Sequence, residues 1–219
     1  MTLSTLPTDL QAAIIDLDGT MVDTLGDFDV VLNTVLAELA LPRIDRGFVE
    51  HTVGKGSEHL IRSTLQQVGA DAALYPRAWA LYQQHYRSVN GAHAHVYPGV
   101  AEGLQRLAAR GWALACLTNK PTDFAVALLR DKGLDHFFAA VFGGDAFERK
   151  KPDPLPLLKT CEALGSKPAR TLMVGDSSND ARAARAAGCP VVLVSYGYNH
   201  GEPVHAVDAD GVIERLDQL

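Results

Sequence analysis

Short apolar runs recur along this chain and alternate with longer segments that have helical periodicity. The apolar runs lie at residues 12–17, 113–117, 138–142, 171–174 and 191–194. The helical patterns between them lie at residues 100–107, 124–132, 155–164 and 179–187, and a glycine comes after each one. Glycine is the common stop at the C-terminus of a helix. Strands and helices that alternate in this way predict an α/β fold built on a parallel sheet with helices on both faces.

The segment from residue 23 to residue 96 has a different pattern. Its apolar residues recur at helical spacing, most clearly at 28–39 and 60–68, and the strand pattern disappears. We therefore predict an all-helical cap domain at 23–96, inserted into an α/β core formed by residues 1–22 and 97–219. Such an insert leaves after the first strand and lies above the carboxyl ends of the strands, where open parallel sheets bind ligands. We expect it to act as a lid.

Composition argues against several classes of protein. Of the 219 residues, 47% are apolar and 21% are charged, which is ordinary for a globular protein with one large core and a smaller unit. The net charge of -6, without a long basic run, argues against nucleic acid as a partner. We find no signal peptide and no stretch of roughly 20 apolar residues, so we expect a cytoplasmic protein without a membrane partner. Cys116, Cys161 and Cys189 match no disulfide or zinc pattern, and we expect them to be buried.

The first apolar run ends in two aspartates. Asp16 and Asp18 stand at positions i and i+2 in DLDGT, so a continued strand places both carboxylates on one face, and Gly19 allows a sharp turn. One interpretation is a turn in which the aspartates only bond nearby amides. The other is chemical, with one carboxylate as a nucleophile and the other as a proton donor or acceptor.

Candidate partners for a phosphate group follow later in the chain. A carboxylate that attacks phosphate needs cations, because two unit charges 4 Å apart repel by about 4 kcal/mol at an effective dielectric constant of 20. Lys151, in KPDP, is the candidate cation, although a solvated lysine in a basic run is the alternative. Thr118 and Asn119, in TNK, offer a hydroxyl, an amide and backbone N–H groups for phosphate oxygens. A threonine at this place is also a typical helix cap.

A second acidic pair follows the apolar run at 171–174. Asp176 and Asp180 lie four residues apart in GDSSND, at the start of a predicted helix. Oxygen ligands of this kind suit Mg²⁺. N-capping is sufficient to explain one of these aspartates, but it does not explain why another acidic cluster follows another strand.

The four stretches DLDGT, TNK, KPDP and GDSSND occur in one order, and this set resembles the haloacid dehalogenase superfamily, specifically its phosphatases with a helical cap. The resemblance spans nearly the whole chain and implies a Rossmann-like core. It implies that Asp16 is the nucleophile that forms an aspartyl-phosphate, and that Asp18 protonates the leaving alcohol and then activates water. The second aspartate of DLDGT favours phosphate esters, because the dehalogenases lack it.

The same resemblance assigns the phosphate and metal sites. Phosphoryl oxygens would be held by Gly19, Thr118, Asn119 and Lys151. Magnesium would be bound by the Asp16 side chain, the Asp18 backbone carbonyl and Asp176, with Asp180 as a supporting carboxylate. The sequence does not distinguish Mg²⁺ from Mn²⁺ or Co²⁺.

Two further stretches, VGKGSEHLI and YGYNHGEP, resemble the bacterial phosphoglycolate phosphatase branch. They imply hydrolysis of 2-phosphoglycolate to glycolate and phosphate. In VGKG, backbone amides and Lys55 would cover the carboxylate of a small acidic substrate; a glycine-rich helix start capped by Ser57 is the alternative. The DADG turn at 208–211 departs from the branch, which has a proline-containing turn there.

Other functions and residues remain as alternatives. A phosphosugar mutase or a broader sugar-phosphate phosphatase would use the same aspartates, and a non-catalytic phospho-aspartate switch would need no large lid. A nucleotide-binding module lacks its GxGxxG or Walker A motif. Trp79, Tyr82 and Tyr86 stand at helical spacing, and we expect them to pack the cap. We expect a small phosphorylated metabolite as the partner and a monomer or homodimer as the assembly.

Overall fold

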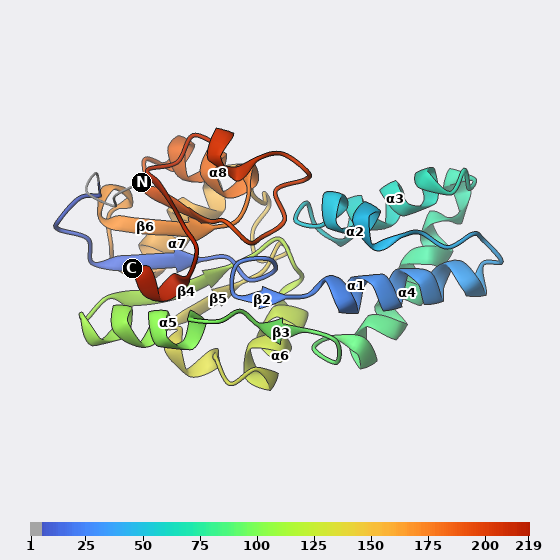
Figure 1. The fold of residues 1–219 in the computed structure, drawn as a ribbon, viewed down its shortest axis with the longest axis horizontal. Helices are drawn as coiled ribbons and strands as arrows, with labels where there is room; N and C mark the ends of the chain where they lie inside the picture. The colour runs from blue at the N-terminus through green and yellow to red at the C-terminus, as the bar shows by residue number, and fades with distance from the viewer. Residues whose placement is uncertain (1–5) are drawn as a thin grey trace.

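A six-stranded parallel sheet forms the centre of the larger part of the molecule, at the left of Figure 1, and we describe residues 6–219 of a computed structural model. In spatial order, its strands are β5 (Ala140–Phe142), β4 (Ala113–Leu117), β1 (Ala12–Ile15), β6 (Thr171–Gly175), β7 (Val191–Val194) and β8 (Gly211–Ile213). All neighbouring strands pair in parallel. The α/β fold with a parallel sheet is therefore confirmed.

Register brings the three central strands to a common edge. Ile15 of β1 lies beside Cys116 of β4 and Val174 of β6. The next residues along all three strands consequently emerge together at the carboxyl ends of the strands. Asp16 continues the ladder by donating its backbone N–H to the carbonyl of Val174 at 2.9 Å.

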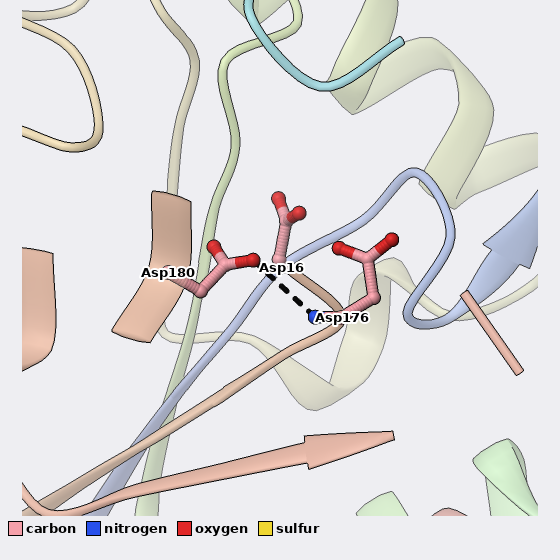
Figure 2. Close-up of side chains that lie close together, drawn as sticks. All are labelled: Asp16, Asp176 and Asp180. Atoms are coloured by element: carbon pink, nitrogen blue, oxygen red, sulfur yellow. Dashed lines mark hydrogen bonds between the residues drawn. The ribbon is translucent and has the colours of Figure 1, made fainter. Parts of the chain in front are cut away.

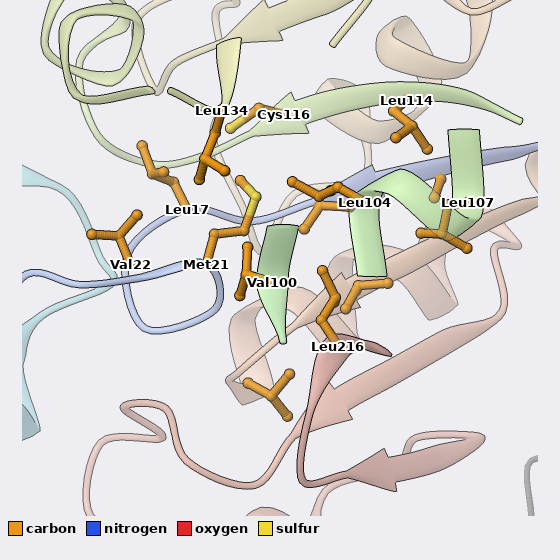
Figure 3. Close-up of a cluster of buried hydrophobic side chains, with 14 of the residues drawn as sticks. Leu17, Met21, Val22, Val100, Leu104, Leu107, Leu114, Cys116, Leu134 and Leu216 are labelled. Atoms are coloured by element: carbon orange, nitrogen blue, oxygen red, sulfur yellow. The ribbon is translucent and has the colours of Figure 1, made fainter. Parts of the chain in front are cut away.

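Helices cover both faces of the sheet, as the sequence predicted. The core helices are α5 (Val100–Ala109), α6 (Thr122–Asp131), α7 (Leu155–Ala163) and α8 (Ser178–Ala187). Successive side chains of a strand point to opposite faces, and β1 follows this rule: Ile15 packs with α5 and α6, and Ile14 packs with α7 and α8. Figure 3 shows the first of these two clusters, in which Leu104 and Leu107 of α5 are completely buried.

Four helices form an insert between β1 and β4, at the right of Figure 1. They are α1 (Leu25–Glu38), α2 (Arg46–Thr52), α3 (Ser57–Gln67) and α4 (Tyr75–Val89), and we call residues 25–89 the helical insert. Their apolar faces form a separate cluster that includes Tyr82 and Tyr86, so these tyrosines pack the insert as predicted. The four helices fall within the predicted cap, whose exact boundaries remain a prediction.

The two connections of the insert lie side by side. Strands β2 (Val22–Asp23) and β3 (His95–Val96) pair in antiparallel fashion. The buried carboxylate of Asp27, at the start of α1, accepts hydrogen bonds from the backbone N–H groups of Gly91 and His93, at 2.6 and 2.7 Å. The β2–β3 pair and the hydrogen bonds of Asp27 therefore connect the insert to the core.

The predicted strands differ from the structure only in small elements. Strand β8 has three residues and β2 and β3 have two each, which is too short for a recognisable alternation, and all three escaped prediction. Strand β5 begins at Ala140, two residues later than predicted. Five short 3-10 helices complete the described structure: Ala72–Leu74, Asp135–Phe137, Pro168–Arg170, Val204–Ala206 and Leu216–Gln218.

Two expectations from composition can be compared with the described residues. The three cysteines are buried and free, as predicted. Within residues 6–219, none of the helices combines the length and the apolar character needed to cross a membrane.

Candidate active site

The polar motifs meet at the carboxyl ends of the central strands. Asp16 follows β1, Thr118 follows β4 and Asp176 follows β6, while Lys151 reaches in from the segment before α7. All four residues, and Asp18 two residues after Asp16, have at least nine-tenths of their surface buried. The structure thus brings together residues that are as much as 160 positions apart in the chain.

Three carboxylates form a buried acidic group. Oxygen atoms of Asp16, Asp176 and Asp180 all lie within 4.8 Å of one another, and Figure 2 shows their side chains pointing toward the same side. Burial raises the pKa of Asp16 from 3.8 to about 7. The attraction of Lys151 opposes this rise, and repulsion from Asp180 adds to it. Burial, with repulsion from Asp180 and Asp16, also raises the pKa of Asp176 well above its ordinary value. A cation bound between these three carboxylates would relieve their mutual repulsion, so the group is suited to hold one.

Lys151 is the cation that the structure already supplies. Its Nζ lies 2.9 Å from Asp16 Oδ1 and 2.7 Å from Asp180 Oδ1, and it donates to the carbonyl of Leu117 at 2.9 Å. Burial opposes the charged ammonium, but attraction to Asp16 and Asp180 prevails and raises the pKa of Lys151. The contact with Asp16 is an ion pair rather than an aligned hydrogen bond, since Asp16 Oδ1 accepts no hydrogen bond from residues 6–219. The alternative of a solvated surface lysine is therefore wrong.

Asp180 holds both Lys151 and the start of helix α8. Its Oδ2 accepts from the backbone N–H and the hydroxyl of Ser177, at 3.2 and 2.9 Å. Gly175 makes room for it, because a Cβ on Gly175 would lie 2.3 Å from Asp180 Cγ. Both oxygens of Asp180 are thus engaged by protein groups, which fits a supporting carboxylate.

Asp176 is fixed from the opposite side. Its Oδ2 accepts the backbone N–H of Tyr198 at 2.6 Å. Gly19 has a φ of +81°, and a Cβ at this position would lie 2.2 Å from Asp176 Oδ2. Gly19 therefore serves the close approach of Asp176, and a role in holding phosphate remains a prediction for its backbone alone.

Thr118 and Asn119 have different environments. The hydroxyl of Thr118 accepts the backbone N–H of Lys120 at 3.2 Å and donates to no protein group among residues 6–219, so its proton is available for a ligand. The side-chain amide of Asn119 donates to the carbonyls of Gly54 and Lys151, each at 2.9 Å. Asn119 therefore ties the helical insert to the core, and only its backbone is left for the predicted phosphate contact.

Lys120 is a functional candidate that sequence reasoning missed. Its Nζ lies 3.0 Å from Asp18 Oδ1 and 2.5 Å from the hydroxyl of Tyr86, on helix α4. The residue belongs to the TNK motif, but the motif gives no sign of this partner. For Tyr86, the sequence showed only helical spacing, which predicts burial in the cap and no contact with a lysine.

A small cavity lies between the core and the helical insert, and we call it the central cavity. Its lining includes Asp16, Asp18, Thr118 and Lys120 from the core, and Phe28, Gly54, Gly56 and Ser57 from the insert. Its volume of ≈ 20 Å³ is room for about one water molecule, which needs about 10–15 Å³. Lys55 is not part of this lining. It faces a separate open groove of ≈ 530 Å³ that also contains Lys150 and Arg182.

The charges of the site are unbalanced. Two ammonium groups are buried with four carboxylates, namely Lys120 and Lys151 with Asp16, Asp18, Asp176 and Asp180. Buried charges need partners, and an all-oxygen set with several carboxylates is the kind that Mg²⁺ prefers. The residues therefore fit a divalent cation, and the site combines carboxylates, fixed cations and a hydroxyl donor in one place.

Comparison with known proteins agrees with this geometry. The family model described as "Haloacid dehalogenase-like hydrolase" matches residues 13–194. Among curated proteins, the phosphoglycolate phosphatases of Thiobacillus denitrificans and Nitrosospira multiformis are each 42% identical, and cover 98% and 96% of this chain over 96% and 94% of their own lengths. Among solved structures, a predicted phosphoglycolate phosphatase from Haemophilus somnus has a TM-score of 0.91 and 31% identity, with 96% of both chains covered.

Proposed function

The chain belongs to the haloacid dehalogenase-like hydrolase family, and from this premise we propose that it hydrolyses a small phosphate monoester, with 2-phosphoglycolate preferred. One observation carries the proposal: Asp16 lines the central cavity together with Asp18 and Thr118, and Lys151 is paired to it at 2.9 Å. The names of the two bacterial relatives support the choice of 2-phosphoglycolate.

The proposed reaction has two steps. In the first, a carboxylate oxygen of Asp16 attacks phosphorus, the bond from phosphorus to the alcohol oxygen breaks, and Asp18 gives that oxygen a proton. In the second, Asp18 takes a proton from water, the water oxygen attacks phosphorus, and the bond to Asp16 breaks to release phosphate. Thr118 and Lys151 hold phosphoryl oxygens throughout, which limits the repulsion between carboxylate and phosphate.

A magnesium ion completes the proposed site. Asp16, the Asp18 backbone carbonyl and Asp176 would hold it, with Asp180 in support. When bound, Mg²⁺ supplies positive charge that neutralises phosphoryl oxygens. The protein's own contribution is to fix these carboxylates through Tyr198, Ser177 and Lys151, as described above.

The helical insert acts as a lid in this proposal. A cavity with room for about one water cannot admit a phosphate ester, so the insert must move to let the substrate enter. Asn119 and Asn179 both donate to the carbonyl of Gly54, at 2.9 and 3.3 Å. These contacts hold the closed position, in which water is excluded from the reacting atoms.

Selection of a small acidic substrate is assigned to the loop before α3. Gly56 precedes this helix of 11 residues and supplies no side-chain cap, and Gly54, Gly56 and Ser57 line the central cavity. Uncapped N–H groups at a helix start favour an anion, such as the carboxylate of 2-phosphoglycolate. Lys55 lies in the neighbouring groove, where its charge would attract the anionic substrate rather than contact the reacting phosphate.

The test is a panel of small phosphate monoesters that includes 2-phosphoglycolate, phosphosugars and phosphate-free analogues as blanks. We expect stoichiometric release of phosphate, fastest with 2-phosphoglycolate, and its loss in Asp16→Asn and under chelation. An isomerised phosphosugar without phosphate release would show a mutase instead. A long-lived phosphorylated protein without turnover would show a phospho-aspartate switch.

The proposal includes a cytoplasmic location. Cys116, Cys161 and Cys189 are free thiols in the fold, and free thiols are typical of proteins from reducing compartments. Fractionation of the native host and detection with an antibody would test this placement.

A further inference from the structure

Lys120 is a buried lysine that the two proposed steps do not use. It is 4% exposed, and its Nζ lies 3.0 and 3.4 Å from the two oxygens of Asp18. A buried ammonium is unfavourable unless it is paired and hydrogen-bonded. The fold therefore keeps the Lys120 ammonium buried although burial is unfavourable, and the contacts of this ammonium indicate its role.

The other contacts of Lys120 come from the helical insert. Its Nζ donates to the hydroxyl of Tyr86 at 2.5 Å, and lies 4.8 Å from the ring centres of both Phe28 and Tyr86. Such positions over aromatic rings stabilise a cation. Phe28 of α1 and Tyr86 of α4 thus contact the ammonium from the helical insert, and a continuous set of contacts runs from α4 through Tyr86 and Lys120 to Asp18.

We propose that Lys120 is a positioning residue, which orients the carboxylate of Asp18 and depends for its own position on Tyr86 of the helical insert. The inference rests on the proposed function, in which Asp18 delivers the proton to the leaving oxygen. Proton delivery requires one carboxylate oxygen within hydrogen-bond reach of that atom. Lys120 contacts both oxygens of Asp18 and so restricts rotation of the carboxylate. The insert then contributes to the chemistry as well as to the exclusion of water.

The chain offers a matched set of variants. Lys120→Met removes the ammonium and keeps the length of the side chain. Tyr86→Phe removes only the hydroxyl that holds Lys120. Tyr82→Phe is the control, because Tyr82 lies one turn away on α4, is equally buried and stacks on Tyr86 at 5.1 Å. The hydroxyl of Tyr82 is near Ser57 but has no hydrogen-bond partner of good geometry among the residues that the structure describes.

The readout is kcat/KM with phenyl phosphate and 4-nitrophenyl phosphate, which are similar in size and differ mainly in the leaving group. Phenoxide leaves poorly without a proton, whereas 4-nitrophenoxide leaves readily without one. We expect Lys120→Met to lower kcat/KM about 100-fold with phenyl phosphate, the size of a lost general acid, and to change it little with 4-nitrophenyl phosphate. Tyr86→Phe should show the same contrast with a smaller loss, and Tyr82→Phe should match the original protein.

Several results would overturn the inference. Equal losses on both esters in Lys120→Met and Tyr86→Phe would show a general structural role. A loss confined to 2-phosphoglycolate, with a raised KM, would make Lys120 a direct ligand of the substrate carboxylate. A crystal structure of Lys120→Met with Asp18 in an unchanged orientation would also refute it. Tyr86→Phe keeps the test open if Lys120→Met fails to fold. No phosphate release by the original protein would instead reject the proposed function, and the crystal structure would still decide the positioning role.

Discussion

Replacing Asp16 by asparagine should stabilise the metal-free protein, although we expect it to abolish turnover. The Asp16 carboxylate is buried within 4.8 Å of two other acidic groups, and its burial raises its pKa to about 7 against the pull of Lys151. Asparagine has nearly the same shape and cannot ionise. Lys151 does not become unpaired in the variant, because Asp180 remains 2.7 Å away.

The size of the effect follows from the two pKa values of Asp16. In the unfolded chain the carboxyl ionises near 3.8, and in the folded protein near 7. Between these values the unfolded state loses its proton first, so the free energy of unfolding falls by about 1.4 kcal/mol per pH unit. The loss is absent below the lower value and reaches at most about 4 kcal/mol above the upper one. Asp16→Asn escapes this loss.

Urea unfolding followed by circular dichroism would measure the difference in the free energy of unfolding between Asp16→Asn and the original protein. In the presence of a chelator, Asp16→Asn should be more stable than the original protein by up to about 4 kcal/mol at pH 8, and by about 1.5 kcal/mol at pH 5. Magnesium should then raise the stability of the original protein and have less effect on the variant, since a ligand stabilises the state that binds it. Asp135→Asn, at an exposed position, is the control and should change the free energy of unfolding by less than about 0.5 kcal/mol.

Two results would refute this reasoning. One is a chelated Asp16→Asn protein that is less stable than the original at pH 8. The other is a stability difference of the same size at pH 5 and pH 8, which would mean that ionisation of Asp16 is not its source.

Three further substitutions test other contacts of the site. Asp180→Ala removes one of the two carboxylates of Lys151 and also the acceptor of the Ser177 N–H and hydroxyl, so the free energy of unfolding in urea should fall by about 1–3 kcal/mol; an unchanged free energy of unfolding would contradict these contacts. Gly19→Ala places a Cβ 2.2 Å from Asp176, so half-maximal activity should need more Mg²⁺, and an unchanged magnesium titration would count against that packing. Asn119→Ala removes a donor to two carbonyls, so we expect the free energy of unfolding to fall by about 1–3 kcal/mol and the loop before α3 to be cleaved faster by a protease. Cleavage at the same rate as in the original protein would show that Asn119 does not hold the insert closed.

The sequence predicted those parts of the structure that local pattern determines. Apolar runs and glycine stops located the strands and the core helices, because periodicity and helix ends are local properties. Asp16 and Asp176 could be placed at one sheet edge because both directly follow parallel strands, whose carboxyl ends share an edge by construction. The strand β8, with three residues, was missed because it depends on pairing with β7 rather than on its own pattern.

Contacts between the insert and the core escaped prediction for a different reason. Helical spacing in α4 assigns Tyr86 to a buried face, but the same spacing holds whether a tyrosine hydroxyl binds an ammonium, as at Tyr86, or has no hydrogen-bond partner among residues 6–219, as at Tyr82. The side-chain amide of Asn119 likewise has the same sequence signature whether it faces phosphate or the carbonyl of Gly54. In each case the partner is chosen by how the insert docks on the sheet. The partner of a polar side-chain end is therefore a tertiary property, and under the proposed function it decides whether the helical insert only covers the site or also orients Asp18.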